Sequence, residues 1–553
     1  MEQKKIPLGK LLQNFGYISE EHIQVALNVQ KANRKFLGQI LQELDFVTPT
    51  EIAIAVAKQY GYEYTDLDRV VFSDEALGIV PFDLAQSKTL LPIEIKDEKL
   101  IVAMEDVNDI EAIDHVSRIS PYPIELVVAD ERKIRRYIEV KYYQLQNPIE
   151  QQIQDKIDQF IDDEEVDIIE LVQLIVNKAI KDGTTDIHIT PDSEVIYLFF
   201  RIDGVLNIAY TLPKKALQPI VSRIKILAKM DISESRLPQD GSFSHEFVGT
   251  RFDLRVSTIP TNHGENIVMR LLSSDTSAFN LESGGFEKEE VNQLKRLFNK
   301  PYGIVLVTGP TGSGKTTTLY TLLRHINFIQ KNIMTIEDPI EYRFSFIRQT
   351  EVNEKAGYTF NEALRTFMRQ DPDAMLVGEM RDQETAELAV RAAITGHLVL
   401  STLHTNDAVG AIPRLLDLGI KDYLLSSSVL AVLAQRLLRR LCPVCKEKTT
   451  VTRDEIVEQD FADHWLEDGK DTFELYKEVG CEHCNNSGYK GREAVIEILE
   501  FTDIVKDMIN KGSAPLAIFE EAQREGMRSL KQNSLIKAFK GKTSINEIKR
   551  VLV

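Results

Sequence analysis

The sequence predicts a multidomain α/β protein, and three observations predict this fold class. A chain of 553 residues is long enough for about three to five domains. Between about residues 285 and 440, apolar runs of strand type alternate with helical patterns, which indicates a parallel sheet with helices on its faces. Beyond that stretch, four cysteines stand as two C-x-x-C pairs. We therefore expect an α/β core, smaller domains before it and a metal-binding segment after it.

The first sixty residues contain a tandem repeat. Residues 7–30 (PLGKLLQNFGYISEEHIQVALNVQ) and 36–59 (FLGQILQELDFVTPTEIAIAVAKQ) are each 24 residues long and are separated by a five-residue spacer. In the middle of each repeat, a serine or threonine precedes an acidic residue, which is typical of a helix start. Each repeat is therefore predicted to form a helix, a turn and a second helix.

Residues 60–143 are expected to form a small α+β unit, which joins the repeat in an N-terminal regulatory or docking module of residues 1–143. The predicted elements are strands over 91–95 and 100–104 around a charged turn, a helix over 110–117 and a strand over 124–128. Residues 144–167 are polar and acidic, and this composition predicts a partly helical, charge-extended linker.

Residues 168–280 are expected to form a second α+β domain. The predicted elements are helices over 168–180 and 220–229 and strands over 251–259 and 265–272. Residues 197–210 alternate in polarity around Asp203-Gly204, which is a strong hairpin signal. Arginines stand on the last two predicted strands, at Arg251, Arg255 and Arg270.

A phosphate-binding loop is complete at residues 309–316, which read GPTGSGKT and match the pattern G-x-x-x-x-G-K-[ST]. The preceding residues 303–308 suit a buried strand and the following residues 316–326 suit a helix, which is the context the motif requires. Loop amides and the helix N-terminus point at phosphate oxygens, Lys315 reaches the β- and γ-phosphates, and Thr316 places its hydroxyl on Mg²⁺. The predicted ATP-binding residues are Gly309, Pro310, Thr311, Gly312, Ser313, Gly314, Lys315, Thr316 and Thr317.

Three further apolar strands of this domain end in polar residues. The strands predicted at 333–336, 374–377 and 398–403 are followed by Glu337, Glu379 and His404. Because ligands of open parallel sheets lie outside the carboxyl ends of the strands, we expect these side chains beside Lys315. Carboxylates near Mg²⁺ suit activation of water, and His404 suits contact with the γ-phosphate. Whether Glu337 or Glu379 activates the water stays open, and His397 at the start of the third strand is a further candidate.

The four cysteines predict a zinc site. Cys442 and Cys445 form the first pair, Cys481 and Cys484 form the second, and 35 residues separate the pairs. In a chain without other cysteines, this pattern favours a tetrahedral structural Cys₄ site over disulfides. The alternatives are free thiols, a redox pair, or a site in which His483 replaces one thiolate.

Composition narrows the class of protein. The formal net charge is −19 and the sequence pI is about 5.2, which argues against non-specific nucleic-acid binding. The sequence has no apolar run long enough to span a membrane and no secretory signal. We therefore expect a cytoplasmic protein that contacts a membrane only through partners.

These motifs resemble those of the secretion and pilus-assembly ATPases of type II secretion and type IV pili. The resemblance covers about residues 1–550. Besides the phosphate loop it is carried by SRLPQDG (235–241), FDLRVSTIP (252–260), TIEDPIEY (335–342), DAMLVGEMRD (373–382), TGHLVLSTLHTNDA (395–408), QRLLRRLCPVC (435–445) and GCEHCNNSGYKGR (480–492).

The resemblance implies an architecture and an activity. It implies a PAS-like α+β domain at 168–280, a RecA-like P-loop ATPase domain at 281–440, a zinc subdomain at 441–495 and a C-terminal helical domain at 496–553. ATP would lie between the first two of these domains in a homohexameric ring. Arg255 and Arg270 would compensate phosphate charge, with Arg201 and Arg236 as lesser candidates. The motor would hydrolyse ATP and drive the cytoplasmic part of inner-membrane platform proteins that assemble a fibre.

Alternatives remain open at two levels. The tandem repeat resembles the cyclic di-GMP-binding module of some family members, but the family motif begins Arg-Leu-Gly, whereas this chain has Pro7 and Phe36 at those arginine positions. Cyclic di-GMP binding and docking to a platform protein are therefore both considered. At the level of activity, the alternatives are a retraction or DNA-transfer ATPase of the same superfamily and a nucleotide sensor without turnover.

Overall fold

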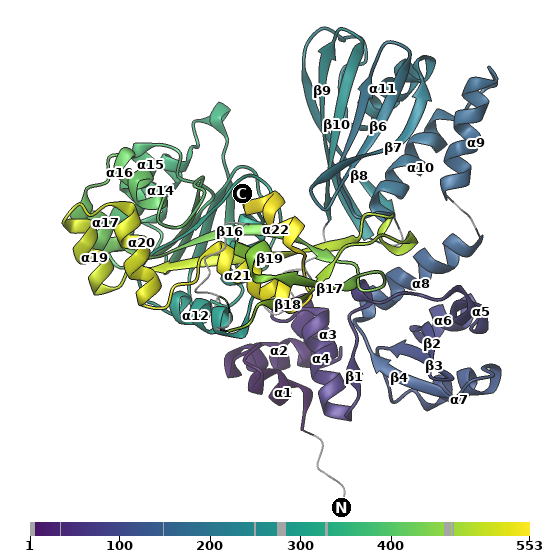
Figure 1. Cartoon of the computed structure of the whole chain (residues 1–553), viewed down its shortest axis with the longest axis horizontal. Helices are drawn as coiled ribbons and strands as arrows, with labels where there is room; N and C mark the ends of the chain where they lie inside the picture. The colour runs from purple at the N-terminus through teal and green to yellow at the C-terminus, as the bar shows by residue number, and fades with distance from the viewer. Residues whose placement is uncertain are drawn as a thin grey trace, which may run out of the picture. The chain divides into compact units, whose positions relative to one another are not determined.

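The computed structural model describes residues 6–33, 35–146, 149–247, 250–273, 284–326, 330–457, 466 and 469–552 (Figure 1). Two compact units are present, one within Pro49–Asp275 and the other within Gly9–Thr48 and Thr276–Val553. Among the helices described, none combines the length and the apolar character that a bilayer crossing needs.

The tandem repeat forms two helix pairs, as predicted. The helices are α1 (Leu8–Asn14), α2 (Glu20–Asn33), α3 (Leu37–Glu43) and α4 (Pro49–Tyr60). Gly16 with φ 74° and Asp45 with φ 56° are left-handed residues at equivalent positions of the two turns. The sequence repeat is therefore also a repeat of backbone conformation.

A four-stranded sheet of order β1-β4-β3-β2 follows. The elements are β1 (Glu63–Tyr64), a 3₁₀ turn (Leu67–Arg69), α5 (Asp74–Ile79), α6 (Phe82–Lys88), β2 (Leu90–Lys96), β3 (Lys99–Met104), α7 (Ile110–Ile119), β4 (Ile124–Val128) and α8 (Glu131–Gln146). The predicted hairpin, helix and strand are confirmed. Strands β2 and β3 pair antiparallel, whereas β3 and β4 pair parallel.

The acidic segment 144–167 is more ordered than a charge-extended linker. Helix α9 (Ile149–Ile161) places Ile149, Ile153, Ile157 and Phe160 in the core that also contains α10 (Ile168–Lys181). These four apolar residues recur at helical spacing, so one face of α9 is buried while the acidic residues lie on the others. The helical part of the prediction is confirmed, but the helix belongs to the core of the domain that follows.

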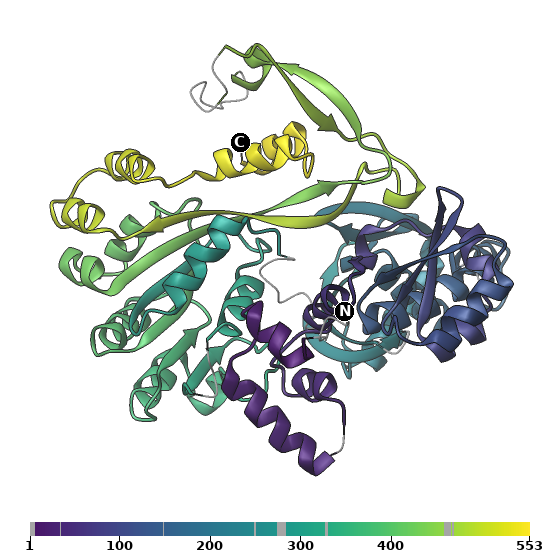
Figure 2. The same cartoon turned by 90° about the horizontal axis from the view of Figure 1, so that it is seen from below.

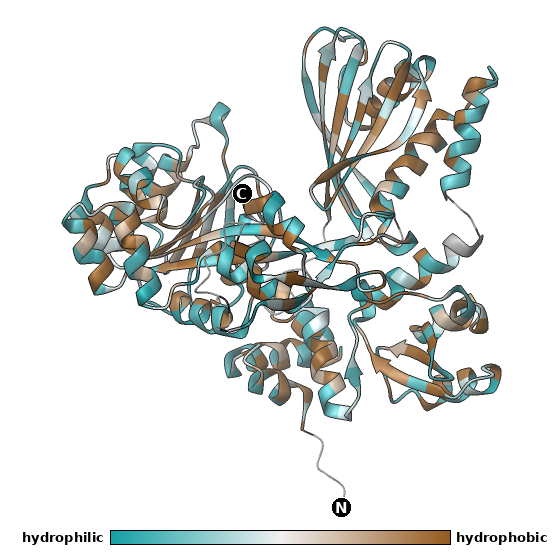
Figure 3. Ribbon diagram, viewed as in Figure 1, coloured by the Kyte–Doolittle hydropathy of each residue, from teal (hydrophilic) through white to brown (hydrophobic). Residues whose placement is uncertain are grey.

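That domain is built on an antiparallel six-stranded sheet of order β7-β6-β5-β10-β9-β8. The strands are β5 (Thr184–Pro191), β6 (Val195–Ile202), β7 (Val205–Pro213), β8 (Gln239–Phe247), β9 (Thr250–Thr261) and β10 (Gly264–Ser273). Helices α10 and α11 (Leu217–Leu227) bury their apolar sides against one face. The alternation of hydrophobic and hydrophilic residues along β9 and β10 is visible in Figure 3. The Asp203-Gly204 hairpin is confirmed between β6 and β7.

The largest sheet has seven strands in the order β13-β12-β14-β15-β11-β16-β19, and all are parallel except β19. The strands are β11 (Gly303–Thr308), β12 (Ile333–Glu337), β13 (Arg348–Glu351), β14 (Ala374–Val377), β15 (Leu398–Leu403), β16 (Val429–Leu441) and β19 (Tyr489–Glu500). The helices are α12 (Lys288–Phe298), α13 (Lys315–Leu323), α14 (Phe360–Phe367), α15 (Gln383–Ile394), α16 (Ala411–Asp417) and α17 (Asp422–Ser428). The predicted parallel sheet is confirmed.

The cysteine pairs stand between the two long strands of this sheet. Strand β16 ends just before Cys442, and β19 begins shortly after Cys484, so the boundary expected at residue 495 falls inside a strand. Between them lie β17 (Glu447–Thr452), α18 (Arg453–Val457) and β18 (Thr472–Lys477). The C-terminal helices, yellow in Figure 2, are α19 (Asp503–Asn510), α20 (Pro515–Arg524), α21 (Leu530–Phe539) and α22 (Ile545–Leu552).

Candidate functional site

The phosphate loop connects β11 to α13 and leaves no room for side chains at two glycines. Gly314 precedes the helix with φ 86°, and a Cβ there would lie 2.8 Å from the Gln435 Nε2 atom. A Cβ at Gly309, where φ is 150°, would lie 2.5 Å from the Gln435 carbonyl oxygen. Glycine is required at both positions because the backbone is left-handed and another strand lies against it.

Lys315 lies at the start of α13 and is buried, with 9% of its surface exposed. Its Nζ donates to the carbonyl oxygens of Gly309 at 2.9 Å and Pro310 at 3.0 Å. Burial lowers the pKa of Lys315, and the Glu379 carboxylate partly offsets this effect. The ammonium group is therefore held over the loop by weak neutral acceptors, which phosphate oxygens can replace.

Glu379 and His404 lie in the electrostatic field of this lysine. Glu379 follows β14, and one of its carboxylate oxygens forms an ion pair with a guanidinium nitrogen of Arg381 at 2.6 Å. The other oxygen lies 3.7 Å from Nε2 of His404, which follows β15. Burial, and then the positive charge of Lys315, lower the pKa of His404. The structure thus brings Lys315, Glu379 and His404 together at the carboxyl edge of the sheet.

Glu337 ends the neighbouring strand β12 but is engaged differently. It is 4% exposed, and its carboxylate accepts hydrogen bonds from the Tyr320 hydroxyl, the Thr335 hydroxyl at 2.6 Å and the Gln349 amide at 3.2 Å. Burial raises the pKa of Glu337. Both carboxylate oxygens have partners within the chain, so Glu337 links α13 to the sheet edge.

The remaining predicted residues of this domain lie either beside the phosphate loop or at the opposite end of the sheet. Thr316, half-buried, and Thr317, exposed, lie in the first turn of α13, next to Lys315. His397 lies at the opposite end of β15, where its carbonyl accepts from the Gly303 amide and its Nδ1 bonds to the Ala392 carbonyl at 2.8 Å. The structure therefore separates His397 from the phosphate loop.

Sequence reasoning missed Gln435, which supports the phosphate loop from β16. Gln435 is 1% exposed, its Nε2 donates to the Ser313 carbonyl at 2.7 Å, and its Oε1 accepts from the Thr318 hydroxyl at 2.7 Å. One amide thus fixes both the loop and the first helical turn. The only signal in the sequence is the position of this polar residue directly after the apolar run 429–434.

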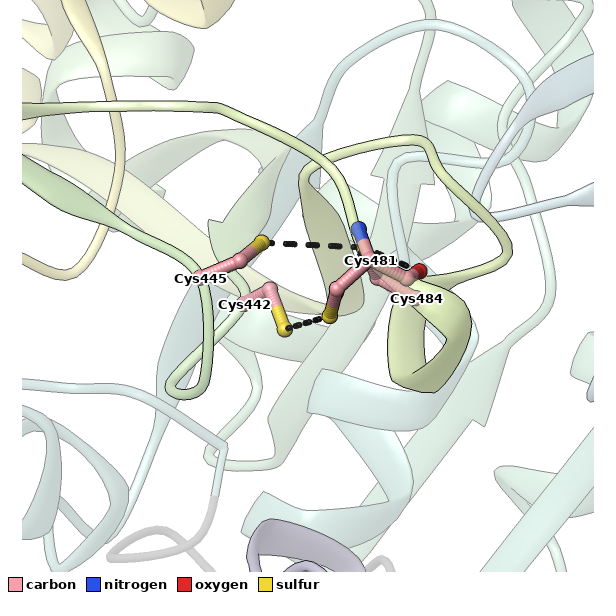
Figure 4. A group of neighbouring side chains, drawn as sticks. All are labelled: Cys442, Cys445, Cys481 and Cys484. Carbon is pink, nitrogen blue, oxygen red and sulfur yellow. Dashed lines mark hydrogen bonds between the residues drawn. The ribbon is translucent and has the colours of Figure 1, made fainter.

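The four cysteines form one cluster (Figure 4). Their sulfur atoms all lie within 4.8 Å of one another, and Cys442–Cys481, Cys445–Cys484 and Cys481–Cys484 are each 3.8 Å apart. Tetrahedral zinc with Zn–S bonds of about 2.3 Å requires sulfur separations of about 3.8 Å. The cysteines are free rather than disulfide-bonded.

Backbone amides support thiolate at this cluster. The Gly480 amide donates to the Cys445 sulfur at 3.3 Å, and the Cys481 and Gly488 amides each donate to the Cys484 sulfur at 3.2 Å. Such bonds favour the charged form that binds metal. Within the described residues His483 is not part of the cluster, so the donor set fits a Cys₄ zinc site.

The arginines of the six-stranded sheet form a separate group. Arg255 on β9 and Arg270 on β10 are directly opposite each other, and both line a cavity of about 440 Å³. Arg201 on β6 approaches Asp186 at 3.6 Å. Arg236 is 87% exposed and pairs with its neighbour Glu234. The structure groups Arg255 and Arg270 with Arg201 around Asp186.

Comparisons with known proteins identify the family of the chain. Residues 162–550 match the family model described as type II/IV secretion system protein, and residues 60–147 match the MshEN domain. The chain is 39% identical to the type IV pilus assembly ATPase PilB of Myxococcus xanthus, with 98% of both chains covered. It is 46% identical to the type II secretion system protein E of Aeromonas hydrophila, over 70% of this chain and 76% of that protein.

A solved structure shares the fold. The X-ray structure of the Yersinia pseudotuberculosis ATPase DotB matches with a TM-score of 0.51 and 21% identity, and the match covers 69% of this chain and 92% of that one. At this identity the likeness is informative about the fold alone.

Proposed function

The chain belongs to the type II/IV secretion system protein family, and from this premise we propose that it hydrolyses ATP to drive assembly of a pilus or pseudopilus fibre. The observation that carries the proposal is the grouping of Lys315, Glu379 and His404 beside a complete phosphate loop. Assembly is favoured over retraction or DNA transfer because relatives matched over nearly the whole chain are named assembly ATPases.

Each group at the sheet edge has a proposed role. Lys315 and the loop amides hold the phosphates, and the Thr316 hydroxyl is the proposed Mg²⁺ ligand. The metal, when bound, supplies charge neutralisation on the phosphate oxygens. Glu379 orients and deprotonates the attacking water, because its carboxylate lies in the field of Lys315 and its partners Arg381 and His404 are exposed. The carboxylate of Glu337 is instead buried and accepts three hydrogen bonds from side chains. His404, held beside Glu379, contacts the γ-phosphate.

Arg255 and Arg270 are proposed to compensate the phosphate charge within a homohexamer. Two arginines side by side on adjacent strands suit a polyanion. The proposed partners are the cytoplasmic parts of inner-membrane platform proteins, which would place the motor in the cytoplasm at the membrane periphery. Nucleic acid is not a proposed partner, because the net charge is −19.

The outer modules have proposed roles of support. Zinc at the four cysteines would hold the loops between β16 and β19 together, since a Cys₄ site leaves no open position for water. For the N-terminal module we favour docking to a platform protein over cyclic di-GMP binding, because Pro7 and Phe36 replace the arginines of the family motif.

Phosphate release by the purified full-length chain with Mg²⁺ and ATP tests the proposed activity. Glu379→Gln is expected to lower kcat by about 10²–10³-fold while binding of a fluorescent ATP analogue persists. Glu351→Gln is the matched control, because Glu351 is an exposed carboxylate at the end of β13 in the same sheet. Nucleotide binding without any phosphate release by the unaltered chain would instead favour the sensor. Equal kcat in the two variants would remove Glu379 from the mechanism.

A further inference from the structure

Four charged residues form a row across the six-stranded sheet. Asp186 on β5 is directly opposite Arg201 on β6 and Arg270 on β10, and Arg270 is directly opposite Arg255 on β9. Directly opposed residues project from the same face of a sheet. The residues that alternate with them, such as Ile187 and Met269, belong to the core beneath α10 and α11. The row therefore lies on the face of the sheet that those helices do not cover.

The row carries more positive than negative charge. It contains three arginines and one aspartate, and arginines placed directly opposite each other on neighbouring strands repel. Among the residues that the structure describes, no hydrogen-bond or ion-pair partner is recorded for Arg255, whereas Arg270 Nε donates to Asp186 Oδ1 at 2.9 Å. Asp186 and, on β8, Asp240 line the same cavity as Arg255 and Arg270. A bound anion would further reduce the repulsion between the two arginines.

Asp186 is held rigidly. It is 7% exposed, its Oδ2 accepts from the Thr185 hydroxyl at 2.8 Å, and Arg201 Nε lies 3.6 Å from the same oxygen. A buried carboxylate with both oxygens engaged has little rotational freedom. It is therefore a fixed reference point for the arginine side chain that it contacts.

The contact with Arg270 uses only Nε. Guanidinium is planar and presents five N–H groups in a fixed fork, so a hydrogen bond at Nε sets the plane of the whole group. The Arg270 side chain is otherwise 59% exposed, and the nitrogens at its end remain available to a ligand. Ordering this side chain in advance removes part of the entropy cost of binding.

We propose that Asp186 is a positioning residue that presents Arg270, beside Arg255, to the polyphosphate of the bound nucleotide. This inference rests on the proposed ATPase activity and assigns to it a residue outside the phosphate loop and the strand ends that carry Glu337, Glu379 and His404. The opposite role, in which Asp186 competes with phosphate for Arg270, predicts a gain of activity when the carboxylate is removed.

Steady-state kinetics of the full-length chain separate these roles. Asp186→Ala is expected to lower kcat by about 10²-fold, the cost of a misplaced catalytic group, with the KM for ATP changed less than about twofold. Asp253→Ala is the matched control, because Asp253 is a carboxylate on β9 that contacts Arg251 instead of Arg270, and its kcat should equal that of the unaltered chain.

A double variant shows whether Asp186 acts through Arg270. If Asp186 acts through Arg270, Asp186→Ala combined with Arg270→Ala has the kcat of Arg270→Ala alone, because neighbouring residues in one contact are not additive. If the double variant loses kcat by the product of the two single losses, the proposal is overturned. It is also overturned if Arg270→Ala lowers kcat while Asp186→Ala leaves kcat unchanged or raises it. An Arg270→Ala variant with unchanged kcat also overturns it, whereas absence of phosphate release in the unaltered chain is failure of the proposed function itself.

A milder substitution tests the proposal if the Asp186→Ala variant fails to fold. Asp186→Asn keeps one acceptor oxygen but loses the charge, so kcat is expected to fall by about tenfold. If Asp186→Ala is insoluble, a kcat of Asp186→Asn equal to that of the unaltered chain overturns the proposal.

Discussion

The phosphate loop and the arginine row both contain cationic side chains, but they differ in how those side chains are held. At the loop, the ammonium of Lys315 is buried and bonded to two carbonyls of its own loop. In the row, Arg270 contacts one carboxylate, that of Asp186. Among the residues that the structure describes, Arg255 has no hydrogen-bond or ion-pair partner. Lys315 thus has its hydrogen-bond partners within its own loop, whereas the arginines of the row are proposed to find part of theirs in the bound nucleotide. Variants of the loop should therefore impair binding and turnover, and variants of the row should impair turnover alone.

The largest effect is expected from Lys315→Ala. Removal of the ammonium group leaves the phosphates without their buried positive charge, so turnover should fall by at least about 10³-fold, with weaker nucleotide binding. Phosphate release and binding of a fluorescent ATP analogue measure the two effects. Elemental analysis should still find one zinc per chain, because the cysteine cluster is built from residues 442–484. A fall in turnover of less than about tenfold would overturn the assigned site.

A comparable loss of turnover with retained binding is expected from Arg255→Ala. An arginine that stabilises transferring phosphate is worth about 10³-fold or more in kcat, and the loop should still hold the nucleotide. Arg251→Ala is the control on the same strand, because Arg251 is an exposed residue that contacts Asp253. If Arg255→Ala weakens nucleotide binding as much as Lys315→Ala does, the expectation that variants of the arginine row impair turnover alone is wrong.

A smaller effect is expected from Gln435→Leu. Leucine has a similar size but cannot bond to the Ser313 carbonyl or to the Thr318 hydroxyl, so the loop should lose its fixed shape while Lys315 remains. We expect the KM for ATP to rise by about tenfold, the cost of one to two buried hydrogen bonds. Gln293→Leu, on α12, is the matched amide control. An unchanged KM would show that the loop keeps its shape without this support.

The same two regions show what a sequence can reveal. The phosphate loop, its strand and its helix were predictable because their residues are contiguous. Gln435 was not, since its partners lie 122 and 117 residues away along the chain. Arg255 and Arg270 were singled out only through the resemblance, and Asp186 was missed because it is 84 residues from Arg270. The acidic composition of residues 144–167 predicts a linker, whereas four apolar residues of helix α9 at helical spacing are buried in the adjoining core. Sequence patterns report local geometry, whereas support of a site depends on strand order.

The smallest effect concerns pH at the loop edge. Because burial and Lys315 lower the pKa of His404, the unfolded chain takes up this proton more readily than the folded chain. The stabilisation is complete above the unfolded pKa of about 6.5 and is lost as pH falls below it. The His404→Gln variant has no imidazole to titrate and so lacks this pH-dependent stabilisation. The melting temperature of the unaltered chain minus that of the variant should therefore decrease from pH 7.5 to pH 5.5. The side chain is 52% exposed, so solvent screening keeps the change below about 1 kcal/mol. A difference that increases towards pH 5.5 would mean that Glu379 outweighs Lys315 at His404, which would contradict the electrostatic order described for this edge.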